Sequence, residues 1–84
     1  MTARKQKVYS AITGYDVNGI AGAEDDFYFS LETKEEKIEQ IKQYAANAMD
    51  IFLNADECLD IYNAIEQETN CASDYYHIYM SLKD

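Results

Sequence analysis

The sequence has 84 residues, of which 48% are hydrophobic in the broad sense, and its formal net charge is −9. A chain of this length has room for a single domain with a modest core, and the composition is typical of a globular protein rather than a disordered one. No apolar run is long enough to cross a bilayer and no apolar segment follows the basic N-terminus, so we expect a cytoplasmic protein.

Charge is distributed unevenly along the chain. Three of the seven basic residues lie in the first seven positions, which predicts a basic tail, 1–7, ahead of a single domain, 8–84. From residue 8 onward, 16 acids stand against four lysines, a net charge of −12. Such a body is repelled by nucleic-acid phosphates and anionic membranes and attracts a basic protein surface. We therefore expect a basic protein partner, and no direct contact with nucleic acid or membrane.

Residues 8–17 alternate in polarity and include β-formers, and Asn18 and Gly19 follow them. Asn-Gly is the strongest two-residue hairpin signal, because both residues tolerate a positive φ. With this turn the paired positions sum to 37, which sets Val8 opposite Phe29. The pattern predicts a β-hairpin.

The stretch GYDVNGIAGAEDD, residues 14–26, also begins like a calcium loop, with Asp16 and Asn18 as its first ligands. The glycine that such a loop requires is replaced by Ala21, and Phe27 stands where a bidentate Glu is needed. We therefore interpret the stretch as a turn and predict no metal site there.

Two amphipathic helices are predicted next, over 34–53 and 55–68, each behind a capping box. The capping pairs are Thr33 with Glu36 and Asn54 with Glu57. Residues 75–82, YYHIYMSL, alternate in side and predict a final strand. The order ββααβ indicates an α+β fold, a small two-layer domain in which two helices cover one face of a three-stranded antiparallel sheet.

The uncovered face of this sheet would carry aromatic side chains that we expect to form a partner-binding platform. They are Tyr9, Tyr28, Tyr75, His77 and Tyr79. The alternative is that tyrosines merely suit a half-exposed strand. Stacking of RNA bases on such a platform is disfavoured by the acids around it.

Acidic residues form the second candidate partner-binding surface, in a loop and along the second helix. They are Glu24, Asp25, Asp26, Asp56, Glu57, Asp60, Glu66 and Glu68. The helix dipole accounts for Asp56 and Glu57 in the first turn, but not for the acids that follow. Spaced carboxylates could imitate a nucleic-acid backbone, whereas the alternative is that they only keep the protein soluble.

Catalytic chemistry has little support in the sequence. His77 is the sole histidine, Cys58 lies on the apolar stripe of the second helix, and Cys71 has no neighbouring base. We predict no catalytic residue, no cofactor and no metal, and two reduced thiols.

These features favour a non-enzymatic acidic inhibitor or regulator that occupies the basic nucleic-acid-binding groove of its target. In size, charge and lack of catalytic groups the chain is similar to the small acidic anti-restriction and anti-CRISPR proteins of phages and mobile elements. The alternative is a structural or accessory domain that self-associates, as a homodimer, through its tyrosine-rich face.

Overall fold

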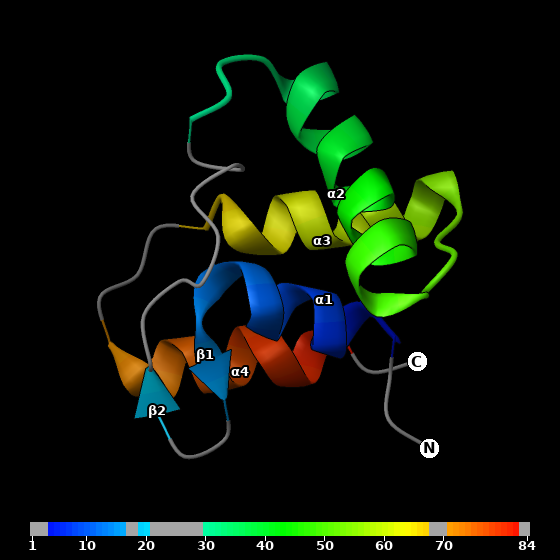
Figure 1. Ribbon diagram of the computed structural model, residues 1–84. Helices are drawn as coiled ribbons and strands as arrows, with labels where there is room; N and C mark the ends of the chain where they lie inside the picture. Colours follow the sequence, from blue (N-terminus) through cyan, green and yellow to red (C-terminus); the bar gives the residue numbers. More distant parts are fainter. Residues whose placement is uncertain (1–3, 17–18, 21–29, 68–70, 83–84) are drawn as a thin grey trace.

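The computed structural model describes residues 4–16, 19–20, 30–67 and 71–82, and this part of the chain forms four helices and one short hairpin (Figure 1). The elements are α1 (Arg4–Thr13), β1 (Tyr15–Asp16), β2 (Gly19–Ile20), α2 (Lys34–Met49), α3 (Ala55–Ile65) and α4 (Ala72–Ser81). Helix α1 lies between α3 and α4, and α2 packs on α3. The predicted α+β domain with a three-stranded sheet is therefore wrong: the described fold is helical.

The first predicted strand, 8–17, is largely replaced by α1. Val8, Tyr9 and Ile12 are all buried. In a strand Tyr9 would point away from Val8 and Ile12, whereas positions 8, 9 and 12 share one face of a helix. Gly14, with φ 77°, follows the helix and donates its amide to the carbonyl of Ser10 at 2.8 Å. As a helix, the segment buries Val8 and Ile12 in one core cluster and Tyr9 in another.

The predicted final strand is replaced by α4. Ile78 and Leu82 are buried, four residues apart, while Tyr76 and Met80 are exposed. An alternating strand would place all four side chains on one face, whereas a helix separates the two pairs. The alternating pattern of residues 75–82 therefore does not reflect a strand, because the buried side chains follow the spacing of a helix.

The predicted hairpin survives as two strands of two residues each. Tyr15 pairs with Ile20 and Asp16 with Gly19, so paired positions sum to 35 rather than 37. The predicted register is therefore wrong by two residues. Most of the predicted second strand falls in 21–29, outside the described residues.

Both central helices and their N-cap residues are confirmed, but the predicted capping box is complete only at α3, and α3 ends at Ile65 rather than at 68. The amide of Glu36 donates to Thr33 Oγ1 at 3.1 Å, and α3 begins with a complete capping box between Asn54 and Glu57. Helix α2 ends at Met49 rather than 53, because Asp50 takes a left-handed conformation (φ 57°, ψ 36°).

The core consists of two clusters on either side of α1. The larger one contains Val8, Ile12, Ile41, Ala45, Leu53, Cys58 and Ile61. The smaller one contains Tyr9, Tyr15, Ala64, Ile78 and Leu82. Among the described residues, no helix has both the length and the apolar character needed to span a membrane.

Candidate protein-binding surface

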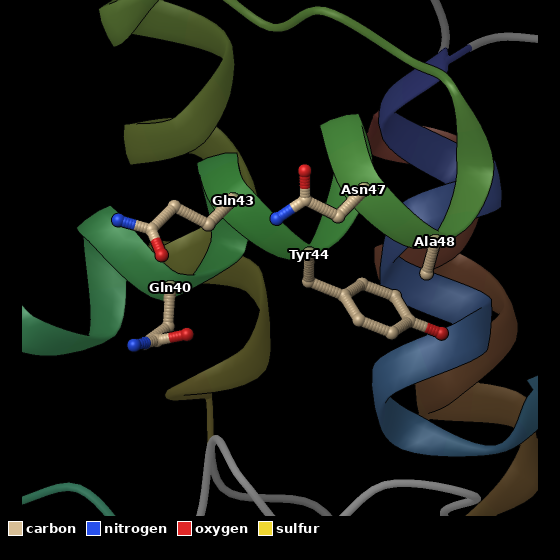
Figure 2. A pocket seen from close by; sticks show the side chains of 5 residues that line it. All are labelled: Gln40, Gln43, Tyr44, Asn47 and Ala48. Carbon is tan, nitrogen blue, oxygen red and sulfur yellow. The ribbon is translucent and has the colours of Figure 1, made fainter.

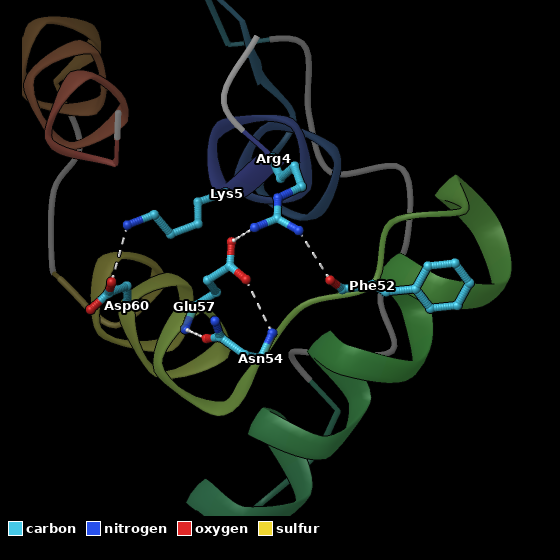
Figure 3. Close-up of polar contacts among 6 residues, drawn as sticks. All are labelled: Arg4, Lys5, Phe52, Asn54, Glu57 and Asp60. Carbon is cyan, nitrogen blue, oxygen red and sulfur yellow. Dashed lines mark hydrogen bonds and ion pairs between the residues drawn. The ribbon is translucent and has the colours of Figure 1, made fainter. Parts of the chain in front are cut away.

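Glu57, one of the predicted partner-binding acids, is bound on three sides by the chain itself. Its amide donates to Asn54 Oδ1 at 2.8 Å, and its Oε1 accepts the amide of Asn54 at 3.1 Å. Its Oε2 lies 2.7 Å from Nη2 of Arg4, at the start of α1 (Figure 3). The Glu57 side chain is only 11% exposed. The Glu57 carboxylate therefore stabilises the fold and is little accessible to a partner.

Two further predicted acids, Asp60 on α3 and Glu66 directly after it, are also paired within the chain. Asp60 lies 3.1 Å from Nζ of Lys5 on α1, and Glu66 lies 3.0 Å from Nζ of Lys37 on α2. Arg4 and Lys5, predicted as part of a basic tail, thus belong to the first turn of α1 and neutralise acids 53 and 55 residues away. Helix α3 has no basic residue of its own, and the packing of α1 and α2 against it brings Arg4, Lys5 and Lys37 to its acids.

The remaining predicted acids are not brought into one patch by the described residues. Asp56 is exposed in the first turn of α3. Glu24, Asp25, Asp26 and Glu68, together with Tyr28 of the predicted platform, lie outside the described residues.

The other predicted platform residues do not form an open aromatic face. Tyr9 is buried in the smaller core cluster, where Tyr75 and Tyr79 pack against it. Burial, followed by the nearby phenols of Tyr75 and Tyr15, raises the pKa of the Tyr9 hydroxyl. Tyr15 stacks on Tyr75 with ring centroids 5.8 Å apart. Tyr9 and Tyr15 are thus part of the core, and Tyr75 and Tyr79 of α4 are half-buried against them.

His77 lies on the outer side of α4, away from this cluster. Its ring meets that of Tyr76 edge-on, with centroids 6.0 Å apart. Both side chains are exposed. His77 is thus separated from the tyrosines with which it was grouped.

Phe52 is the exposed feature that sequence reasoning missed. It falls within the amphipathic helix predicted over 34–53, yet it lies beyond the end of α2 and its side chain is 72% exposed. The loop between α2 and α3 carries three consecutive apolar residues, Ile51, Phe52 and Leu53, of which Leu53 is buried. This run of three apolar residues directly before the Asn54 cap is the sequence signal for an exposed apolar side chain. A short loop cannot turn three successive side chains inward.

The loop that carries Phe52 is held at its start and at its centre. At its start, the amides of Asp50 and Ile51 both bond the carbonyl of Ala45. At its centre, Nη1 of Arg4 donates to the carbonyl of Phe52 at 3.2 Å (Figure 3). The aromatic ring in Figure 3 points away from these polar contacts. We call the exposed residues Asp50, Phe52, Asn54 and Asp56 the Phe52 surface.

A second feature is a hollow of about 150 Å³ on the outer side of α2 (Figure 2). Its lining residues are Gln40, Gln43, Tyr44, Asn47 and Ala48. None of these side chains is charged. Among the described residues, no group of three metal-binding side chains lies close enough together to hold an ion.

The two cysteines differ in environment. Cys58 is buried in the larger core cluster, and this burial raises the pKa of its thiol. Cys71 is exposed, just before α4, and its Sγ lies 3.0 Å from the Ser73 hydroxyl. This hydrogen bond, with those from nearby backbone amides, lowers the pKa of the Cys71 thiol.

Comparison with known proteins adds no relative: no family model, curated protein or solved structure matches the chain. The site is therefore defined by its geometry and charge alone.

Proposed function

We propose that this chain is a non-enzymatic acidic domain that binds a basic protein, with Phe52 as the apolar anchor of the interface. The observation that carries the proposal is a phenyl ring 72% exposed on a loop whose backbone is held by Arg4. An aromatic side chain on a fixed backbone loses little conformational freedom on binding, and such anchors supply a large share of binding energy.

Charge supports the choice of a basic partner. Asp50 and Asp56 stand within four residues of Phe52 on either side, and both are exposed. The paired acids of α3 are neutralised locally, yet the chain as a whole keeps a net charge of −9. That field accelerates the approach of a positively charged surface, and the exposed carboxylates of Asp50 and Asp56 are available to its cations.

The conformation of Asp50 supports the same surface. A left-handed residue that ends a helix is most often glycine, because a Cβ is strained in this conformation. Asp50 bears that strain and keeps a carboxylate two residues from the ring. Strain of this kind is concentrated at functional sites.

The partner class that we favour is a nucleic-acid-handling protein, whose basic groove normally accepts phosphates. An acidic domain bound there would exclude the nucleic acid and act as an inhibitor or regulator. Action against a restriction or CRISPR system is one setting that fits the size and charge of the chain.

The test is a comparison of three tagged baits in host lysate: the wild-type chain, Phe52→Ala and Leu59→Ala. Leu59 is the matched control, because it is another exposed large apolar residue, 36% exposed, on α3 and outside the Phe52 surface. We expect the wild-type and Leu59→Ala baits to retain the same basic nucleic-acid-binding protein, and Phe52→Ala to lose it. Washing at high salt should release it from both.

Retention of the partner by Phe52→Ala at the wild-type level would contradict the proposed anchor. Retention at high salt would contradict the proposed role of charge. If the purified partner bound its nucleic acid and this chain at the same time, inhibition by occupation of the groove would be refuted.

A further inference from the structure

The loop that carries Phe52 shares a core with α1. Leu53, the residue after Phe52, is buried with Val8 and Ile12 of α1 in the larger core cluster. A side chain in a close-packed core cannot move unless its neighbours move as well. The position of the loop therefore depends on the packing of α1, although Arg4, the first residue of α1, precedes Phe52 by 48 positions.

Arg4 adds a polar link between the same two elements (Figure 3). Its Nη1 donates to the Phe52 carbonyl at 3.2 Å, and its Nη2 donates to Glu57 Oε2 at 2.7 Å. Two nitrogens of one planar guanidinium thus bind both the loop and the capping box that follows it. Glu57 is bound to Asn54 through its amide and its carboxylate, so the bonds of Arg4 join α1, the loop and the start of α3 into one unit.

We propose that Arg4 is the positioning residue of the Phe52 surface, and that the Phe52 loop and α1 open and close together. Segments that share buried contacts and hydrogen bonds open locally as one unit. Because coupling between two sites is reciprocal, a partner bound at Phe52 also holds α1 in place. The coupling of α1 to the loop needs no partner, whereas its effect on binding rests on the proposed function.

Lys5 provides a matched control in the same turn of α1. Its Nζ lies 3.1 Å from Asp60 Oδ2, so it also pairs α1 with α3. Asp60 lies beyond the first turn of α3, away from the Asn54 cap. Arg4→Gln and Lys5→Gln each remove one positive charge and one ion pair. Any difference between them therefore reports on the contacts of Arg4 with the loop and its cap.

The first experiment is amide hydrogen exchange of the free chain, measured by NMR. The amides of Ile51 and Asn54, on either side of Phe52, are both hydrogen-bonded. Arg4→Gln should raise their exchange rates on the order of fivefold, the effect of losing one hydrogen bond. Lys5→Gln should leave these rates within about twofold of the wild type, because its ion pair is partly exposed and does not touch the loop.

The second experiment follows the side chain at position 52. The sequence contains no tryptophan, so Phe52→Trp introduces a single indole there. The decay of its fluorescence anisotropy reports the nanosecond motion of the ring and its loop. Adding Arg4→Gln should increase the amplitude of this motion, and adding Lys5→Gln should not. A loss of global stability alone would not change this measurement, because it is made on the folded chain.

A conservative variant separates the charge of Arg4 from its shape. Arg4→Lys keeps the positive charge beside Glu57 but replaces the forked guanidinium with a single nitrogen. It should retain most of the stability of the wild type, while the amides of Ile51 and Asn54 exchange nearly as fast as in Arg4→Gln. Exchange at the wild-type rate would refute the bridging role of the guanidinium.

The third experiment measures binding of the basic nucleic-acid-binding protein that the wild-type bait retains. Arg4→Gln should bind it on the order of fivefold more weakly than Lys5→Gln, because opening of the loop then competes with binding. The two variants have the same net charge, so their long-range attraction to the partner is equal. Circular dichroism with the helical signal of the wild type confirms that each variant is folded.

The outcomes separate this inference from the proposed function. Equal exchange and equal anisotropy in Arg4→Gln and Lys5→Gln overturn the coupling of α1 to the loop, whatever Phe52→Ala does to binding. Faster exchange in Arg4→Gln with unchanged affinity for the partner overturns the positioning role. If Arg4→Gln opens the loop while Phe52→Ala retains the partner, the coupling stands and the proposed function fails.

Discussion

The guanidinium of Arg4 lies 2.7 Å from the carboxylate of Glu57, which links the first turn of α1 to the first turn of α3 across 53 residues. The same guanidinium bonds the carbonyl of Phe52 at 3.2 Å. One side chain thus joins the capping box of α3, the loop before it and the N-terminal helix. The basic start of the chain is therefore part of the fold and of the support beneath Phe52.

Glu57 has two roles that substitution can separate. Glu57→Gln keeps an oxygen for the Asn54 amide and loses the ion pair, so it should lower the free energy of unfolding by about 0.5–1 kcal/mol. Glu57→Ala removes both roles and should cost about 2 kcal/mol. Urea unfolding followed by circular dichroism measures both values. Equal losses for the two variants would refute the separation.

Asp50→Gly should stabilise the chain by about 1 kcal/mol, because glycine relieves the left-handed strain at the end of α2. If the Phe52 surface binds a basic partner, the same variant should bind it more weakly. The two effects are measured by thermal unfolding and by titration of the partner. The control for loss of charge alone is Asp56→Asn, because asparagine and aspartate have similar backbone preferences. Asn54→Gly is unsuitable, because it removes the cap of α3.

Cys71 should react with a disulfide reagent such as DTNB in the folded protein, while Cys58 should react only after unfolding. The hydrogen bond from Ser73 lowers the pKa of the Cys71 thiol, so its thiolate fraction near neutral pH exceeds that of an ordinary cysteine. Ser73→Ala should slow the reaction at pH 7 and move its pH profile to higher values. An unchanged profile would show that Ser73 does not stabilise the thiolate.

Stability should fall at alkaline pH. Burial raises the pKa of both the Cys58 thiol and the Tyr9 hydroxyl, so the unfolded chain loses these protons at lower pH than the folded one. Their contribution is complete below the unfolded pKa values and is lost as the pH rises above about 9. Urea unfolding at pH 8 and pH 10 should show a smaller decrease for Cys58→Ala than for the wild type. An equal decrease would exclude a role for this thiol.

The helical nature of α4 can be tested with two neighbouring residues. Ile78→Ala should cost roughly 2–4 kcal/mol, because it leaves a cavity in the smaller core cluster. Met80→Ala should cost well under 1 kcal/mol, since this side chain is exposed. In an alternating strand both residues would share a face and cost similar amounts. Similar losses would therefore contradict the helix.

The sequence by itself determined the two central helices and their starting points. Thr33 and Asn54 each satisfy amides within three residues of themselves, so the signal and its physical cause lie in the same short segment. The burial of Cys58 also followed from its place on a helical stripe. Local hydrogen bonds and a clear 3.6-residue period need no knowledge of the rest of the chain.

Tertiary structure decided the rest. Residues 8–12 and 75–82 carry apolar side chains at spacings that suit both a strand and a helix, and the choice depended on what each segment could bury against its neighbours. The bonds of Arg4 to the Glu57 carboxylate and to the Phe52 carbonyl join residues about 50 positions apart. Such long-range contacts leave no trace in a short stretch of sequence, because they arise only once the helices have packed.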